Sequence, residues 1–258
     1  MSLATSYRAE LLKTKRTSSF WLSLLGAAFI PAIFLLAYLL KPDGAARSMQ
    51  AAPWNMHFFM GWKAMAGFLL PMFVVLLCAL VPQIEYRNNT WKQVYASPQS
   101  YGQIYFSKLL TIHTMLLFFF VAYNLFMLLT GVTAALVHKQ FNFLDKGFEV
   151  GKLLALNVKI YISTMGIAAI QYWLSLRFKN FIAPVGIGLA MLIGATVANA
   201  FDWEYIYELP FAHPNLTLEW VNKSTTYWLQ PHEWNALGYF FVFTIIGFLD
   251  VRYRKEKG

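Results

Sequence analysis

The sequence has few charged residues and a single cysteine. Of its 258 residues, 13% are charged and 58% are hydrophobic, whereas roughly 25% of the residues of a soluble domain are charged. Cys78, the one cysteine, lies inside an apolar run, where we interpret it as a packing residue. A single cysteine excludes an intrachain disulfide and a cysteine-based metal site. This composition predicts a membrane protein.

Motifs of common active sites are also missing. The sequence contains no Gly-x-x-x-x-Gly-Lys-Ser/Thr loop for ATP phosphates and no Gly-x-Ser-x-Gly nucleophile elbow. Its five histidines are far apart and form no His-Glu-x-x-His pair. An intramembrane enzyme would need facing polar pairs, and the spans offer no persuasive set. We therefore expect no catalytic residue, no cofactor and no metal in this chain, and no enzyme.

The net charge of +9 does not form one basic face. The positive residues are scattered at the ends of apolar runs, which argues against a nucleic-acid partner and indicates membrane topology. With both termini on the inner side, most of the 21 Lys and Arg residues fall on that side and most acids fall outside. The positive-inside rule therefore predicts cytoplasmic termini in a multi-pass protein of the cell membrane.

Six apolar stretches predict an all-α membrane protein with six transmembrane helices in a single domain. The first two contain 21 uncharged residues each, enough to cross a hydrocarbon core of about 30 Å. We expect the first span to be retained, because a mostly polar segment precedes it. Lys159 interrupts the fourth span, so we place its ammonium in the outer headgroups. The expected spans are 20–40, 64–84, 109–130, 153–176, 181–201 and 234–251.

The segment before the first span, 3–19, is interpreted as an amphipathic helix on the membrane surface. Its apolar residues share one helical arc, and its basic residues border or oppose that arc, so anionic lipid would hold it there. A merely basic flank before a span is the alternative. The apolar residues are Leu3, Ala4, Tyr7 and Leu11, and the basic ones are Arg8, Lys13, Lys15 and Arg16.

The polar segment 85–108 lies between the second and third spans. Asn89 or Thr90 is expected to cap a short helix with its side chain, and Pro98 ends that helix. A second helix begins near Ser100 and continues into the third span, so a displacement of the segment would reach the membrane. One face of the short helix carries Trp91, Val94 and Tyr95.

Glu85 marks the cytoplasmic end of the second span. It could pair with Arg87, with Lys92 or with a basic residue of the N-terminal helix, and so hold the segment in place. The alternative is a solvated carboxylate at the interface, which needs no partner.

Two further features concern the fifth span and the outer loop, 202–233. Small residues recur at intervals of four in the fifth span, which favours either association with another chain or tight packing within this one. Aromatic and acidic residues of the loop could anchor it at headgroup level or form an outer gate for a cationic or amphipathic substrate. The small residues are Gly186, Ala190, Gly194 and Ala198, and the gate candidates are Trp203, Glu204, Glu208 and Trp220.

Glu85, Thr90-Trp91 and Ser97-Pro98, placed after the second span, resemble the cytoplasmic loop of type-2 ATP-binding-cassette (ABC) permeases. The order of spans looks like that family over nearly the whole chain. The opening AELLKTKRTSSFWL is similar to bacterial permeases of the lantibiotic-immunity and bacitracin-resistance exporters.

The resemblance implies partners, which composition does not. A separate ABC ATPase subunit would carry ATP and Mg and dock through the first cytoplasmic loop and the N-terminal helix. A second permease copy, or a homologous permease, would pair along the first and fifth spans in a bacterial inner membrane. The implied ATPase-coupling residues are Glu85, Thr90, Trp91, Val94, Tyr95, Pro98, Arg8 and Lys15.

The function expected from these features is export of a hydrophobic or amphipathic substrate, such as a peptide antibiotic, by alternating access coupled to ATPase subunits. The alternative is a non-transporting membrane scaffold or sensor that recruits a cytosolic partner. Under the first hypothesis, Trp91→Ala and Tyr95→Ala dissociate or uncouple the ATPase.

Overall fold

The computed structural model describes residues 2–49, 51–221 and 227–253. These residues are mostly helical and contain no strand, so the predicted all-α class is confirmed. The helices are α1 (Leu3–Thr14), α2 (Ser18–Leu40), α3 (Pro42–Met49), α4 (Pro53–Ala66), α5 (Leu69–Arg87), α6 (Trp91–Ala96), α7 (Tyr101–Val137), α8 (Val150–Arg177), α9 (Ile182–Ala200), α10 (His213–Val221) and α11 (Pro231–Tyr253), with short 3-10 turns η1 (Ile206–Glu208) and η2 (Pro210–Ala212).

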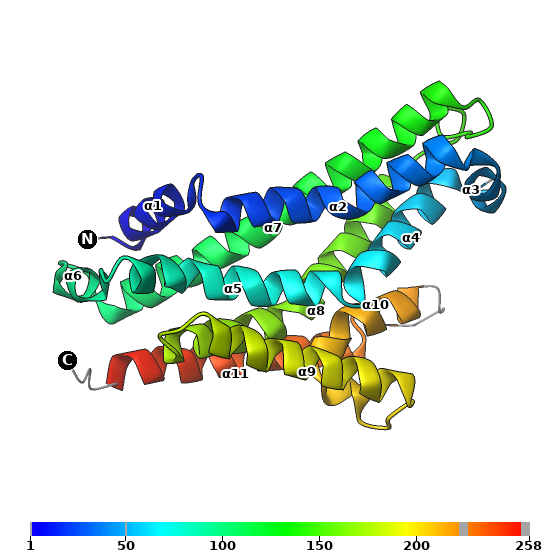
Figure 1. Ribbon diagram of the computed structural model, residues 1–258. Helices are drawn as coiled ribbons and strands as arrows, with labels where there is room; N and C mark the ends of the chain where they lie inside the picture. The colour runs from blue at the N-terminus through cyan, green and yellow to red at the C-terminus, as the bar shows by residue number, and fades with distance from the viewer. Residues whose placement is uncertain (1, 50, 222–226, 254–258) are drawn as a thin grey trace.

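Within the described residues, six helices are long and apolar enough to cross a membrane: α2, α5, α7, α8, α9 and α11. They run between two ends of an elongated bundle (Figure 1). We call one end the N-terminal end, because α1, α6 and the last turns of α11 lie there. The opposite end carries α3 and the end of α7. An even number of crossings places the start of α2 and the end of α11 at the same end.

The second predicted span, 64–84, is wrong at its start. A break at Gly67 and Phe68 divides this apolar stretch between α4 and α5, and α5 continues to Arg87. Pro71 explains the break, because proline has no N–H and its ring clashes with the carbonyl four residues earlier. Hydropathy alone does not predict the break, since the residues on both sides of it are apolar.

The third predicted span, 109–130, lies within a longer helix. Helix α7 is continuous over 37 residues, about 55 Å at 1.5 Å per residue, and therefore projects beyond a hydrocarbon core of about 30 Å. It begins as expected after Ser100, whose hydroxyl accepts from Gln103 N–H in a reciprocal capping box. Near its end, Gly131 lies against the Trp54 ring of α4, and the helix continues to Val137.

The predicted N-terminal helix, 3–19, is in fact two helices. Helix α1 ends at Thr14, and Arg16 adopts a left-handed φ of 64°, which turns the chain into α2. The buried face of α1 is polar, formed by Ser6, Glu10 and Thr14. Among the residues of the predicted apolar arc, Leu3 is exposed. Ala4 is exposed too, whereas Tyr7 and Leu11 are half-buried, and the Tyr7 hydroxyl lies 2.6 Å from Thr114 Oγ1 of α7.

Polar pairs join α7 and α8 inside the bundle. His113 Nδ1 lies 2.8 Å from the Tyr161 hydroxyl. The amides of Asn124 and Asn157 bond each other reciprocally, at 2.7 and 3.2 Å. Such bonds satisfy polar groups that would otherwise be unpaired in an apolar environment, and they fix the two helices in register.

The outer segment 202–233 is folded, not an open loop, over its described part. Ile206 of η1, Phe211 of η2 and Leu216 of α10 are buried. Helix α10 packs on α4, α8 and α11. This segment therefore closes the opposite end of the bundle with apolar contacts.

Helix α9 packs through Gly188 and leaves Gly186 open. A Cβ at Gly188 would lie 2.8 Å from both Val75 Cγ1 and Gln171 Oε1, whereas a Cβ at Gly186 would meet no atom within 4 Å.

We expect Gly188→Ala to destabilise the protein by about 1–3 kcal/mol, because α9 must move away from α5 to make room. Thermal unfolding in detergent measures the change. Gly186→Ala is the matched control, with the same gain in helix propensity and no clash. Equal melting temperatures for the two variants would contradict the packing described for α9.

Candidate functional site

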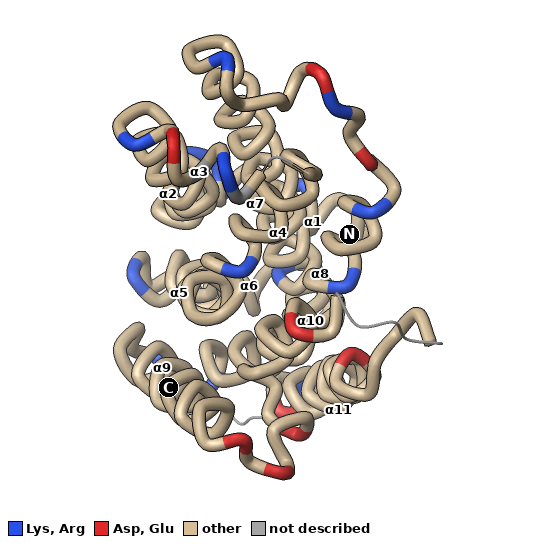
Figure 2. The backbone as a smooth tube through the Cα atoms, turned by 90° about the vertical axis from the view of Figure 1, so that its right-hand side faces the viewer, with Lys and Arg blue, Asp and Glu red and all other residues tan. Residues whose placement is uncertain are grey.

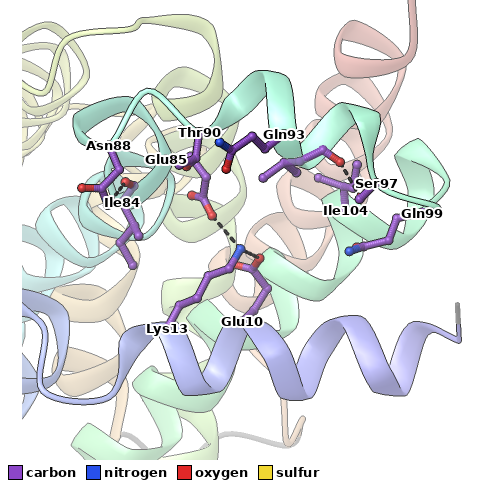
Figure 3. Close-up of a pocket in the computed structure, with 11 residues that line it drawn as sticks. Glu10, Lys13, Ile84, Glu85, Asn88, Thr90, Gln93, Ser97, Gln99 and Ile104 are labelled. Atoms are coloured by element: carbon purple, nitrogen blue, oxygen red, sulfur yellow. Dashed lines mark hydrogen bonds and ion pairs between the residues drawn. The ribbon is translucent and has the colours of Figure 1, made fainter.

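Four charged residues form a closed cluster where α1, α5 and α7 meet. Glu10 accepts from Lys13 at 2.6 Å and from Lys108 at 2.8 Å. Glu85 Oε1 lies 2.9 Å from Lys13 Nζ and 2.7 Å from Lys108 Nζ. Each carboxylate thus contacts both ammonium groups, and the charges alternate. Figure 3 shows Lys13 of α1 between Glu10 and Glu85. We call Glu10, Lys13, Glu85 and Lys108 the charge cluster.

Most of the charge cluster is removed from solvent. The Lys108 side chain is 0% exposed, and the Glu85 side chain is 1% exposed. An isolated charge in such a position would lose its hydration without compensation, so the pairing makes the burial possible. Lys108 Nζ also lies 5.4 Å from the centre of the Trp91 ring, a cation–π contact with α6.

The pairing keeps the α1 members of the cluster charged. Burial raises the pKa of Glu10, but the Lys108 and Lys13 ammonium groups outweigh burial and hold the pKa below its ordinary value. Burial likewise lowers the pKa of Lys13, and hydrogen bonding and attraction to Glu10 and Glu85 outweigh it, so that the pKa lies above its ordinary value. Both groups are therefore ionised at neutral pH.

The structure shows which of the basic residues proposed from the sequence is paired with Glu85. Its described ion-pair partners include a basic residue of the N-terminal helix, Lys13, and not Arg87 or Lys92. Glu85 is buried, so the solvated alternative is wrong. The cluster thus joins the carboxyl end of α5 to α1 through side chains 72 residues apart in the chain.

Helix α6 packs on this cluster with the face predicted from the sequence. The Trp91 ring stacks on Tyr95 at 5.4 Å and lies 5.2 Å from Tyr86 of α5. Val94 and Tyr95 are half-buried with Trp91. The helix ends at Ala96, before Pro98. The aromatic face is therefore turned toward the bundle.

The capping predicted for α6 is wrong in one respect. Thr90 is the N-cap, but its side chain accepts no hydrogen bond from the helix, and Asn89 takes a left-handed φ of 52°. The backbone makes the connection instead, because Thr90 N–H donates to the Glu85 carbonyl at 3.0 Å. The turn into α6 is thus held by the last residues of α5.

The opposite face of α6 is exposed, with Lys92, Gln93 and Ala96 in solvent. Pro98 is exposed as well, and so are Arg8 of α1 and Lys15, which follows the end of α1. These residues form the surface of the N-terminal end that a partner could contact directly, whereas Trp91, Val94 and Tyr95 support it from within.

A polar cavity of about 390 Å³ separates α1 from α6. Figure 3 shows side chains from α1, α5, α6 and the start of α7 around it. Hydrogen-bonding groups from the charge cluster and from α6 face the same space, which suits a polar segment of a partner. The lining residues are Glu10, Lys13, Ile84, Glu85, Asn88, Thr90, Gln93, Val94, Ser97, Gln99 and Ile104.

Sequence reasoning identified Glu85 and α6 but missed Glu10 and Lys108 as members of the site. A signal existed for both. Glu10 is the one acidic residue among the first nineteen, and Lys108 is the last charge before a long apolar run. An isolated charge at such a place needs a partner of opposite sign.

The small residues of α9 lie mostly on a free surface. Gly186, Ala190 and Gly194 are exposed, and a Cβ at either glycine would meet no atom within 4 Å. Ala198 is half-buried. At 3.6 residues per turn, each four-residue step rotates by about 40°, which brings the last member back toward the bundle. The ridge is therefore Gly186, Ala190 and Gly194, and internal packing does not account for it.

The outer gate candidates do not form one cluster. Trp203, Glu204 and Glu208 are exposed on the segment that follows α9, where Figure 2 shows acidic residues grouped at that turn. Trp220 lies at the end of α10 and lines a different cavity, beside α4 and α8. The four residues thus belong to separate surfaces.

The position of Lys159 in the outer headgroups stays a prediction, and the structure shows which protein groups surround its side chain. Its side chain is 18% exposed and lies 4.0 Å from the Glu233 carboxylate of α11. Its ammonium also faces the Trp228 ring at 5.9 Å. The side chain is thus held mainly among protein groups, since a neighbouring helix supplies a counter-charge.

We expect Lys108→Met to destabilise the protein by about 3–5 kcal/mol, because it leaves two buried carboxylates sharing one ammonium. The Glu10→Gln/Lys108→Met double variant should cost less than the sum of the two single changes. Unfolding of all three variants in detergent completes the cycle. Lys92→Met, which removes an exposed charge, is the control and should change little. Additive losses would show that the two side chains are not coupled.

Comparison with known families agrees with this architecture. No curated protein matches the chain. The sequence profile of a family described as ABC-2 family transporter protein matches residues 7–195, which include α1 from Tyr7, the charge cluster, α6 and most of α9. This match covers well over half of the chain, and the six apolar helices agree with it. The chain therefore belongs to the ABC-2 family of transporter proteins and is a multi-pass membrane permease of that family.

Proposed function

We propose that this permease exports a hydrophobic or amphipathic substrate, such as a peptide antibiotic, by alternating access driven by separate ABC ATPase subunits. ATP and Mg belong to those subunits. The observation that carries the proposal is the connection of α1, α5, α6 and α7 through the charge cluster, because a partner that displaces α6 displaces a continuous helix of 37 residues with it.

The proposed orientation places the N-terminal end in the cytoplasm of a bacterial cell, with the protein in the inner membrane. Basic residues at this end support that orientation through the positive-inside rule. They include Arg8, Lys15, Arg87, Lys92 and Lys179. In this orientation the exposed face of α6 and the cavity beside α1 are open to a cytoplasmic ATPase.

The structure changes which residues should contact the ATPase. Lys92 and Gln93 would touch it directly, whereas Trp91 and Tyr95 would act by holding α6 on the bundle. Alternating access then requires the ATPase to favour one position of α6 over another, since a ligand shifts only an equilibrium between states that it binds unequally.

We expect Lys92→Glu to lower recovery of the ATPase at least about tenfold, because charge reversal in an interface costs more than 1.4 kcal/mol. The permease should melt as before. Trp91→Ala should also lose the ATPase, with greater hydrogen exchange in α6. The measurements are co-purification from native membranes in mild detergent and substrate-stimulated ATP hydrolysis. Lys139→Glu, an exposed lysine at the opposite end, is the matched control.

Normal co-purification together with normal stimulated hydrolysis in both variants would refute the proposed coupling surface. A wild-type preparation without any nucleotide-binding partner would instead favour the scaffold or sensor function.

We also propose that α9 pairs with a second permease, either another copy or a homologous chain. Its ridge of Gly186, Ala190 and Gly194 allows close backbone approach, which drives helix association in lipid. The exposed apolar neighbours Ile193 and Val197 would extend the contact.

We expect Gly194→Leu to lower the dimer fraction by about tenfold or more, because a bulky side chain separates the two backbones. Cross-linking in membranes and light scattering in detergent measure the fraction. Gly238→Leu on α11, which likewise has no atom within 4 Å, is the matched control and should remain dimeric. An unchanged dimer fraction in Gly194→Leu would show that α9 does not form the dimer interface.

A further inference from the structure

A second cavity, of about 500 Å³, lies toward the opposite end of the bundle between α4, α8 and α10. Its walls are largely aromatic and aliphatic, with Phe58, Phe59, Leu156 and Trp220 among them. The size falls in the range of ligand sites, which are typically about 300–1,000 Å³. The described residues of the charge cluster and of α6 contribute nothing to it.

The charged groups that line this cavity are both cations. Lys152 and Lys159 are two turns apart on α8, and no acidic residue belongs to the lining. Lys152 is 73% exposed and pairs at 2.5 Å with Glu149, which also accepts from Asn55 at 3.3 Å. Lys152 thus already has a neutralising partner at the mouth of the cavity.

Lys159 is the less satisfied of the two. Glu233 lies 4.0 Å from its ammonium, which is longer than a hydrogen bond. The Glu233 oxygens accept instead from Gln230 N–H at 2.8 Å and from the Thr217 hydroxyl at 3.4 Å. Within the part of the chain that the structure describes, no acceptor is within hydrogen-bonding distance of Lys159 Nζ, although an ammonium has three protons to donate.

We propose that this cavity binds an amphiphile with an anionic headgroup, of the phosphate type found in acidic phospholipids. The headgroup accepts from Lys159, with Lys152 at the rim, and an acyl chain packs on Phe58, Phe59 and Leu156. A half-buried ammonium among apolar walls is complementary to an anion joined to an alkyl chain, and it does not suit a cationic ligand.

This site goes beyond the proposed export function. It does not depend on that function, because the proposal concerns only the binding of an anionic amphiphile. It also gives Trp220 a place, as part of the apolar wall around an anionic ligand. The cavity therefore has the opposite charge preference from a gate for cations.

The test is isothermal titration of the full chain in mild detergent with three probes. These are dioctanoyl phosphatidylglycerol, dioctanoyl phosphatidylcholine and glycerol phosphate. We expect the wild type to bind the anionic lipid at least about tenfold more tightly than the zwitterionic one, the scale of one charge-assisted hydrogen bond. Glycerol phosphate alone should bind much more weakly, since it lacks the acyl chain.

Two variants separate charge from volume. Lys159→Gln should abolish the preference for the anionic lipid, and Leu156→Trp should fill the cavity and weaken the anionic lipid about tenfold with both lysines intact. Lys139→Gln is an exposed lysine outside the lining, and Leu154→Trp changes a 63% exposed position on the same helix. Both controls should bind as the wild type does. Because the two variants differ in chemistry, failure of one to fold leaves the other to decide.

Two results would overturn the proposal. If the wild type and Lys159→Gln each bind the two lipids with equal affinity, the cavity is a general lipid contact without preference for an anionic headgroup. Binding of glycerol phosphate as tight as that of the anionic lipid, and unchanged by Leu156→Trp, would make it a site for free anions only.

Discussion

The burial of four charges at one end of the bundle is the constraint on which the arrangement of the N-terminal end depends. Lys108 and Glu85 lie on helices that belong to the apolar bundle, and their ammonium and carboxylate can be removed from water only in contact with opposite charges. Glu10 and Lys13 of α1 complete the set. Helix α1 is therefore tied to the bundle by its polar face.

The position of α6 follows from the same cluster. The Trp91 ring lies over the Lys108 ammonium. The N–H of Thr90, the residue before α6, donates to the Glu85 carbonyl. A short helix of six residues has little stability of its own, so these contacts fix its place. Because Lys108 belongs to α7, its contact with Trp91 joins α6 to a continuous helix that reaches the opposite end.

Charged side chains are paired differently at the two ends of the molecule. At the N-terminal end the charges of the cluster are equal in number, and each carboxylate contacts both ammonium groups. Toward the opposite end, Lys159 is only partly matched by Glu233, since other donors already occupy that carboxylate. Between them, α7 and α8 are joined by the His113–Tyr161 contact and the Asn124–Asn157 pair. Lys108 of α7 belongs to the charge cluster and Lys159 belongs to α8, so these polar pairs join one helix from each region.

The sequence by itself determined the membrane class, the six crossings, the short helix ending before Pro98 and the start of α7 near Ser100. These depend on composition, on hydrophobic length and on the position of proline, which short stretches of chain contain. It could not determine the break before α5, the partners of Glu85, the inward direction of Trp91 and Tyr95, or the separation of Trp220 from Trp203. Those were decided by tertiary structure, because each depends on which distant side chain is brought opposite. Glu10 and Lys108 are 98 residues apart, and only the folded bundle places them in contact.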